Sequence, residues 1–235
     1  LARARAVRVL FAAARYAQDP LADQRYAFVV RDPAGEWWHT HRRIGGVEPA
    51  DHDRCVGISG HGSERIVTDS TKVGMPETGI GLFPDVGGTY LLARTPGLLG
   101  LHAALSGAPF TGADAIAMGF ADHFVPHERL EAFLATATAD GPVAAVAAHA
   151  QEPPPSPLLA QRDWIDECYA GDTVPDILAA LGDRGGDQAA KAAELISSRS
   201  PVALAVTLEA VRRAGTLTSL EDVLRQEFRT SCASL

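Results

Sequence analysis

Cysteine is scarce in this sequence, and long apolar stretches are missing. The three cysteines, Cys55, Cys168 and Cys232, are odd in number, lie far apart and form no C-x-x-C pair. This spacing argues against a disulfide framework and a structural zinc site, and it favours a reducing compartment such as the cytoplasm. No stretch of about 18 apolar residues occurs, so we expect no transmembrane helix and no membrane partner.

Positive charge is also in short supply. The formal net charge is -8 and the sequence pI is about 5.4. Because no basic stripe is present, a nucleic-acid partner is not expected. A phosphate-bearing small molecule remains compatible, since a few local cations and helix N-termini are enough to hold phosphates. With 46% hydrophobic and 21% charged residues, the 235-residue chain can build one large core or two small ones.

The start of the sequence carries no clear targeting signal. Residues 1–5 are basic and an apolar segment follows, but that segment lacks the length and the cleavage site of a signal peptide. Because no initiator methionine precedes Leu1, we expect the sequence to begin inside a longer gene product.

The first quarter of the chain has a mixed pattern. Residues 7–17 are rich in Ala, Leu and Arg and predict a helix that ends at Asp19-Pro20, and residues 27–30 predict a short strand. Residues 31–55 show neither a helical nor a strand period. This abrupt loss of pattern leads to the hypothesis that the segment is translated out of frame, which reading the encoding DNA in all three frames would test.

Regular structure is expected again from Val56 onward. Phe83-Pro84 predicts a helix start, because proline suits the first helical turn. Thr111 predicts a capped helix start and Gly119 a helix end. The expected strands are 65–68, 72–75 and 121–125, and the expected helices are 85–94, 98–106 and 127–139.

A proline-rich stretch at 152–157 predicts a linker, and everything beyond it is expected to be helical. Ser200-Pro201 predicts the start of a helix over 202–214, and the capping-box pattern at 218–221 predicts the start of the last helix. We therefore expect an α/β part over 1–150, irregular at 31–55, and a helical region over 151–235.

One run, MPETGIGLFPDVGGTY at 75–90, carries a chemical pattern. It places Glu77 at a strand end and Asp85 in a first helical turn, with glycines that let backbone approach a ligand. Apolar neighbours predict a raised pKa for Glu77, whereas a helix dipole favours ionised Asp85. Two carboxylates in different environments can divide acid and base roles. The alternative is that Asp85 only complements the dipole and that Glu77 is solvated.

The same run closely resembles the signature of the 3-hydroxyisobutyryl-CoA hydrolases, which belong to the crotonase (enoyl-CoA hydratase/isomerase) superfamily. The similarity continues through 107–112 and 117–121 and resumes at Ser200-Pro201 and at 227–229. The resemblance implies an α/β fold of the ClpP/crotonase class, with stacked β-β-α turns and a helical C-terminal region. It also implies that the N-terminal sheet is incomplete here.

The resemblance implies hydrolysis of an acyl-CoA thioester, 3-hydroxyisobutyryl-CoA, as in valine breakdown. Coenzyme A would be part of the substrate, with no separate cofactor, and the helical region would serve assembly into a homo-oligomer. Glu77 would be the catalytic carboxylate, assisted by Asp85. The positions expected to contact substrate are Pro76, Ile80, Gly81 and Gly57.

Two departures from the superfamily pattern affect this prediction. Gly57 stands where hydratases carry a second catalytic Glu, which favours hydrolysis over hydration. The oxyanion hole needs two backbone N–H groups, and residues 4–6 and 53–55, including Arg54 and Cys55, stand where the family has glycine-rich turns. Losing one donor typically costs about 10²–10³ in rate, so we expect weak turnover. Enoyl-CoA hydratase/isomerase activity and a non-catalytic assembly partner remain as alternatives.

The remaining polar clusters do not predict a second site. The histidines and acids around 39–55 have the residue types of metal ligands, but nothing in the sequence sets their geometry, so we expect no metal. Arg212-Arg213 is expected to complement the dipole at a helix C-terminus. A contact with a coenzyme A phosphate is the alternative for this pair.

Overall fold

The computed structural model describes residues 9–11, 25–31, 37–43 and 64–234. These residues belong to two compact units. The first contains the described residues up to 43 together with 64–73 and 111–156, and the second contains 74–110 and 157–234.

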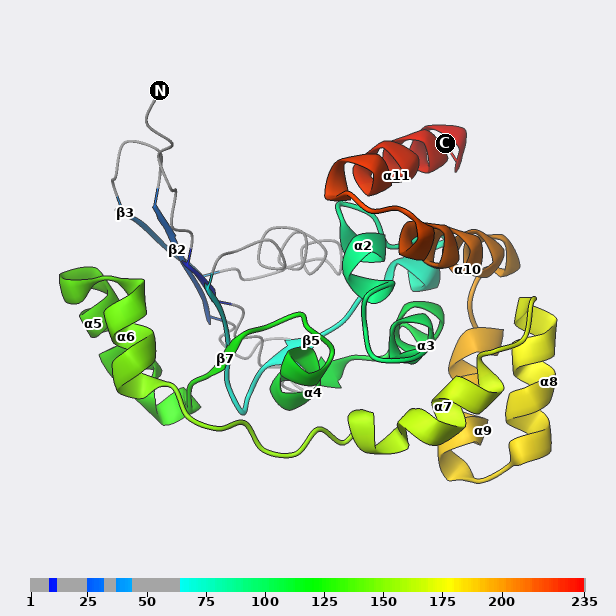
Figure 1. Ribbon diagram of the computed structural model, residues 1–235, viewed down its shortest axis with the longest axis horizontal. Coiled ribbons are helices and arrows are strands. Elements are labelled where there is room, and N and C mark those ends of the chain that lie inside the picture. The colour runs from blue at the N-terminus through cyan, green and yellow to red at the C-terminus, as the bar shows by residue number, and fades with distance from the viewer. Residues whose placement is uncertain (1–8, 12–24, 32–36, 44–63, 235) are drawn as a thin grey trace. The chain divides into compact units, whose positions relative to one another are not determined.

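A parallel sheet lies in the first unit (Figure 1). Its strands are β1 (Val9–Phe11), β4 (Glu64–Val67) and β7 (His123–Phe124), in the order β1-β4-β7. Phe11 is opposite Ile66, and Ile66 is opposite His123. Because parallel neighbours need crossover connections, this is the α/β arrangement expected from the sequence.

An antiparallel pair, β2 (Arg25–Arg31) and β3 (Trp37–Arg43), also belongs to this unit, with a register from Arg25 opposite Arg43 to Arg31 opposite Trp37. The strand predicted at 27–30 is confirmed. The expectation that 31–55 contains no strand is wrong for β3, whose hydrogen-bonding partner is another strand that a one-segment pattern does not reveal.

The helix predicted at 7–17 is wrong at β1, where pairing with β4 overrides helical propensity. The remainder of that predicted helix lies outside the described residues. The strands predicted at 65–68 and 72–75 correspond to β4 and to β5 (Lys72–Val73).

Local signals set the helices that follow in this unit. The capping box predicted at Thr111 is confirmed, because Asp114 Oδ2 accepts the Thr111 N–H at 2.8 Å and Thr111 Oγ1 accepts the Asp114 N–H at 3.2 Å. Gly119 follows with φ 79° and ends the turn. The elements are β6 (Phe110–Thr111), α4 (Gly112–Ala117), η2 (His127–Arg129), α5 (Leu130–Asp140) and α6 (Pro142–His149).

The core of the first unit joins β4 to α5 and α6. It contains Ile66, Val125, Phe133, Ala137 and Ala145, all nearly or fully inaccessible to solvent. The strand therefore lies under a helix pair, which is typical of an α/β layer.

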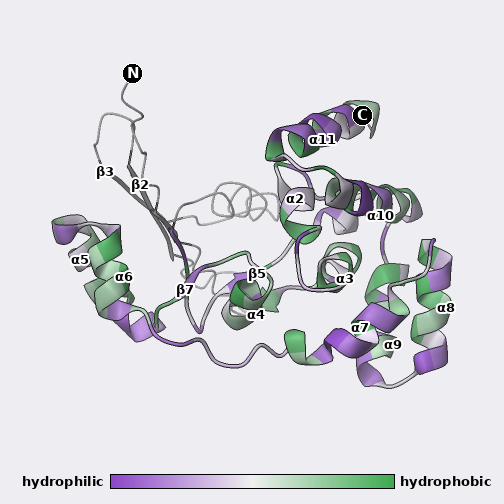
Figure 2. Cartoon of the chain, in the orientation of Figure 1, coloured by the Kyte–Doolittle hydropathy of each residue, from purple (hydrophilic) through white to green (hydrophobic). Residues whose placement is uncertain are grey.

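The second unit is helical. Its elements are η1 (Glu77–Ile80), α2 (Gly88–Leu92), α3 (Leu99–Ser106), η3 (Leu159–Gln161), α7 (Arg162–Cys168), α8 (Val174–Arg184), α9 (Asp187–Ser197), α10 (Pro201–Thr216) and α11 (Leu220–Ser234). Helix α3 is central and packs against α2, α7, α9 and α10. The surrounding helices are amphipathic, and Figure 2 shows hydrophobic and hydrophilic residues mixed along α8 and α11.

The first residues of the two C-terminal helices largely agree with the prediction from the sequence. Ser200 caps α10 by accepting the Ala203 N–H at 3.4 Å, as predicted. The cap of α11 lies one residue later than predicted, since Ser219 Oγ, and not Thr218, accepts from the Asp222 N–H at 3.1 Å.

The boundary between the two units at Pro157 falls in the predicted proline-rich linker. Residues 74–110 were predicted with the N-terminal part, but they pack with the C-terminal helices, because α2 and α3 bury their apolar faces against α10. None of the helices in the described part of the chain has the length and apolar content needed to span a membrane.

Candidate active site

Glu77 is a buried carboxylate at the start of a short 3₁₀ helix. Its exposed fraction is 3%, and that of Thr78 is 0%. Gly81 ends η1 with φ 84°, a left-handed conformation that glycine adopts without strain. The Leu82 N–H then donates to the Glu77 carbonyl at 2.9 Å. The interpretation of Glu77 as a solvated surface residue is therefore wrong, because η1 turns its side chain inward.

Residues of η1 lie against α3 and close to the Arg199 side chain. Thr78 Oγ1 donates to the Ala104 carbonyl of α3 at 3.4 Å. The Arg199 guanidinium donates to the Ser106 carbonyl at 2.9 Å from Nη2, and its Nη1 would lie 2.7 Å from a Cβ added at Gly79. A side chain at position 79 would therefore displace Arg199.

Asp85 lies in a turn and not in a helix. Helix α2 starts at Gly88, whose N–H donates to the Asp85 carbonyl at 2.7 Å. The prediction of a helix from residue 85 is therefore wrong, because the turn at Val86 and Gly87 delays the helix. The expected dipole effect fails with it: desolvation by burial raises the pKa of Asp85, and a backbone hydrogen bond only partly opposes this.

The turn after Asp85 has an unusual backbone. Val86 has φ 53°, and among the described residues it is the single non-glycine residue with positive φ. A β-branched side chain is strained in this region, typically by about 1–3 kcal/mol. Gly87 continues the left-handed path with φ 83° and is the N-cap of α2. Surrounding contacts must therefore hold this turn in place.

Glu227 of α11 supplies those contacts. Its carboxylate accepts from the Gly87 N–H at 2.7 Å, the Thr89 N–H at 3.0 Å and the Thr89 hydroxyl at 2.5 Å. Glu227 has an exposed fraction of 2%. Its pKa is raised, first by desolvation, which the bonds from Gly87 and Thr89 partly offset, and the charge of Asp85 raises it further.

Sequence reasoning noted Glu227 only as part of a similar run. One signal was available: Glu227 follows Val223, which is fully buried, by one helical turn, so an acidic residue occupies the buried face of α11.

The chain from Ile80 to Val86, around the second predicted catalytic carboxylate, exposes apolar side chains. Ile80, Leu82 and Val86 have exposed fractions of 55%, 44% and 53%. Ile80 and Gly81, predicted to contact substrate, are exposed, and Pro76 is partly buried as the N-cap residue of η1. An exposed apolar patch beside a buried carboxylate is typical of a surface that binds a ligand.

The other predicted site residues belong to segments outside the part of the chain that the structure describes. Gly57 and the degenerate oxyanion turn with Arg54 and Cys55 lie outside the described residues. The same holds for residues 4–6 and for most of the histidine-rich segment. Over the part of the chain that the structure describes, no group of His, Cys, Asp or Glu side chains is arranged to hold a metal ion.

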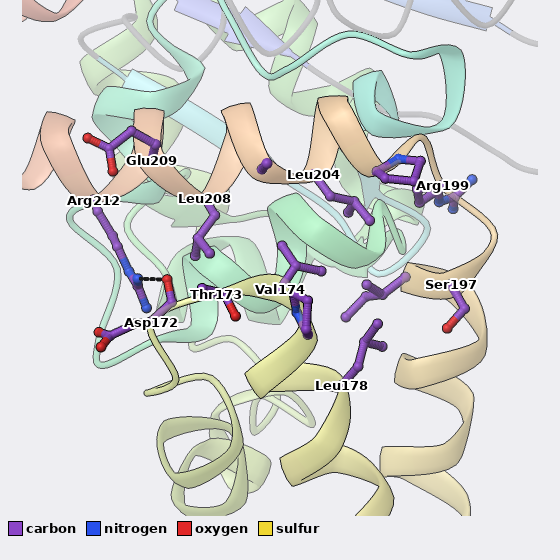
Figure 3. A pocket seen from close by; sticks show the side chains of 14 residues that line it. Asp172, Thr173, Val174, Leu178, Ser197, Arg199, Leu204, Leu208, Glu209 and Arg212 are labelled. Atoms are coloured by element: carbon purple, nitrogen blue, oxygen red, sulfur yellow. Dashed lines mark hydrogen bonds between the residues drawn. The ribbon is translucent and has the colours of Figure 1, made fainter.

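A groove of about 560 Å³ lies elsewhere in the helical unit (Figure 3). Val174, Leu178, Leu204 and Leu208 form an apolar wall between α8 and α10. At one end, Arg212 donates to the carbonyls of Asp172 at 2.9 Å and Gly171 at 2.5 Å. The Arg212 guanidinium therefore holds the chain ahead of α8.

Comparisons with known proteins identify the family. The family model described as enoyl-CoA hydratase/isomerase matches residues 55–235. The chain belongs to the enoyl-CoA hydratase/isomerase family. This confirms the family expected from the run at 75–90.

Curated proteins similar to this chain are named as hydrolases. The chain is 37% identical over 189 residues to 3-hydroxyisobutyryl-CoA hydrolase 1 of Arabidopsis thaliana, covering 75% of this chain and 50% of that protein. It is 36% identical over 191 residues to the mitochondrial 3-hydroxyisobutyryl-CoA hydrolase of Homo sapiens, covering 77% of this chain and 49% of that protein. The chain thus spans about half the length of the curated relatives it matches.

Solved structures of enoyl-CoA hydratase/isomerase proteins share the fold. A carnitinyl-CoA dehydratase from Mycobacterium thermoresistibile is 66% identical with a TM-score of 0.75, over 76% of this chain and 53% of that one. An enoyl-CoA hydratase from Rhodobacter sphaeroides is 38% identical with a TM-score of 0.68, over 74% and 50%. The predicted crotonase-like α/β class is confirmed. The cytoplasmic location stays a prediction, since the human relative is named mitochondrial.

Proposed function

We propose that this chain hydrolyses an acyl-CoA thioester, with 3-hydroxyisobutyryl-CoA as the substrate. The observation that carries the proposal is the burial of the Glu77 carboxylate at the start of η1, beside an exposed apolar segment. A desolvated carboxylate is a stronger base than a hydrated one. The hydrolase names of the curated relatives support the choice of reaction and acyl group.

In this proposal, Glu77 takes a proton from water as the water oxygen adds to the thioester carbonyl carbon. The carbon–sulfur bond then breaks, and the coenzyme A sulfur leaves with that proton. Asp85 orients the water or the substrate hydroxyl, a role that its half-buried position and raised pKa favour. Pro76, Ile80 and Gly81 contact the acyl and pantetheine parts. Coenzyme A belongs to the substrate, and the absence of a further cofactor stays a prediction.

The first test measures release of free coenzyme A from 3-hydroxyisobutyryl-CoA with a thiol reagent. Glu77→Gln keeps the size of the side chain and removes its basicity, so kcat should fall by about 10²- to 10⁴-fold. Glu194→Gln, an exposed position on α9, is the matched control and should leave kcat unchanged. Equal coenzyme A release by the wild-type protein and Glu77→Gln would remove Glu77 from the mechanism.

Addition or elimination of water is a second candidate. It is favoured by the 66% identity to a structure titled carnitinyl-CoA dehydratase. The two reactions are separable in one reaction vessel, because hydrolysis of 3-hydroxyisobutyryl-CoA frees a thiol, whereas elimination of water from the same ester forms an enoyl double bond. A gain of enoyl absorbance without thiol release would replace the hydrolase proposal. Calorimetric binding of the coenzyme A ester without either product would favour a non-catalytic assembly partner.

A further inference from the structure

The short helix after Asp85 lacks a cap of its own. Helix α2 has 5 residues, and its N-cap Gly87 has no side chain to bind the first amides. A helix this short is not stable by itself, because nucleation is costly and few intrahelical bonds repay it. Stability at this position must therefore come from other elements.

Glu227 provides that cap from a distant part of the chain. The bond from the Gly87 N–H spans 140 positions in sequence, and the bonds from Thr89 span 138. Its two carboxylate oxygens divide the donors: Oε2 takes the Gly87 amide and Oε1 takes both groups of Thr89. Hydrogen bonds to a buried carboxylate are among the stronger ones in proteins.

The capped turn is the same turn that carries Asp85. The Asp85 carbonyl accepts from Gly88, which lies between the residues that Glu227 binds. Between Asp85 and Gly87 stands Val86 with its strained φ of 53°. Without Glu227, relaxation of Val86 would rotate the peptide that follows Asp85 and change the direction of the Asp85 side chain.

We infer that Glu227 is a positioning residue, which fixes the Asp85–Thr89 turn from helix α11 and thereby sets the orientation of the Asp85 carboxylate for the reaction. This inference rests on the proposed function in assigning Asp85 a role in the reaction. Glu227 itself acts through the Gly87 and Thr89 amides. Helix α11 thus contributes to the site although it is more than 130 positions away in sequence from the turn it holds.

The test compares Glu227→Gln with Glu221→Gln. Glu221 is on the same helix, is exposed and pairs with Arg225, so its substitution controls for loss of one negative charge on α11. In Glu227→Gln one carboxylate oxygen becomes an NH₂ group, which cannot accept a hydrogen bond. At least one of the hydrogen bonds from Gly87 or Thr89 is therefore lost. We expect hydrogen exchange of the Gly87 and Thr89 amides, followed by NMR, to become about 10- to 100-fold faster, with no change in Glu221→Gln.

The kinetic readout separates positioning from general instability. For Glu227→Gln, kcat should fall by about 10- to 100-fold while KM stays within about twofold, at a temperature where both variants are fully folded. Faster amide exchange with unchanged kcat would overturn the positioning role and leave a purely structural one. Amide exchange equal to that of the wild-type protein would overturn the inference whatever the kinetics.

Substitutions of Thr89 give a second test of the inference, which does not require the Glu227→Gln variant to fold. Thr89→Val removes the hydroxyl donor and keeps the shape and the N–H bond, so kcat should fall by less than in Glu227→Gln. Thr89→Ser keeps the hydroxyl and should restore kcat to near the wild-type value. Equal kcat values for Thr89→Val and Thr89→Ser would contradict a role for this bond.

The same measurements keep the inference apart from the proposed function. If the wild-type protein releases no coenzyme A from 3-hydroxyisobutyryl-CoA, the proposed function fails. Exchange of the Gly87 and Thr89 amides in Glu227→Gln still decides whether Glu227 holds the turn.

Discussion

Gly100 occupies a position in α3 where no larger residue fits. A Cβ there would collide with the backbone carbonyl of Leu92 and would lie 2.8 Å from Thr95 Oγ1. Thr95 cannot move freely, because its Oγ1 also accepts from the Gly100 N–H at 2.8 Å. The close approach of α3 to the end of α2 therefore depends on the missing side chain.

Substitution of Gly100 by alanine should lower the free energy of unfolding by about 3 kcal/mol, because the colliding atom is backbone and overpacking of this kind is not relieved by a rotamer change. Gly182→Ala is the matched control. Gly182 is in helix α8 with open space around it. The same substitution there should raise the free energy of unfolding by about 0.5–1 kcal/mol. Urea denaturation measures both, and equal shifts in the two variants would contradict this account.

At the scale of elements, a histidine–tyrosine pair joins α3 to the end of α7. His102 Nδ1 and the Tyr169 hydroxyl share a hydrogen bond of 2.8 Å, and the two rings meet edge to face at 5.3 Å. Trp164 packs on the same imidazole at 5.7 Å. Desolvation by burial lowers the pKa of His102 to about 4, and burial raises that of Tyr169.

Because of His102, the free energy of unfolding should decrease as the pH falls. In unfolded chains His titrates near a pKa of about 6.5, so above that value both states are neutral and the contribution is complete. As pH falls from about 6.5 towards 4, the unfolded state binds a proton that the folded state does not. At pH 5 the free energy of unfolding should be about 1–2 kcal/mol lower than at pH 7.5 through His102 alone.

The measurement compares urea denaturation of the wild-type protein and His102→Gln at the two pH values. The variant keeps a polar group near Tyr169 and removes the titration, so its stability should change less between pH 7.5 and 5. An equal pH dependence in both proteins would show that His102 is not the responsible group.

At the scale of the whole molecule, turnover depends on groups that no single helix supplies. The resemblance places the oxyanion donors at 4–6 and 53–55, where this sequence has other residues, including Arg5 and Arg54, in place of glycine. The combined substitution of Asp53, Arg54 and Cys55 by glycine should raise kcat for the thioester by about 10²–10³-fold, which is the typical effect of one oxyanion donor.

This comparison uses the same thiol-release assay and includes Glu77→Gln in the glycine background as a control for background hydrolysis. Turnover by the unmodified chain equal to that of the glycine variant would show that other backbone N–H groups supply the hole.

Much of the local structure and the family were accessible from the sequence. The capping signals at Thr111 and Ser200 involve partners within one helical turn, so a short window contains all the atoms that decide them. The run at 75–90 is long and specific enough to indicate the family and to single out Glu77 and Asp85. These features depend on residue order and little else.

Only the tertiary structure decided the rest, because the deciding partners are remote in sequence. The sequence predicts a helix over β1, but the structure has a strand there because β4 supplies its hydrogen bonds. Asp85 was placed in a helix because Pro84 precedes it, whereas Glu227, 140 positions beyond Gly87, holds a strained turn there. Local propensity is worth a fraction of a kcal/mol per residue, and buried charged hydrogen bonds are worth more, so where the two compete the remote contact determines the backbone.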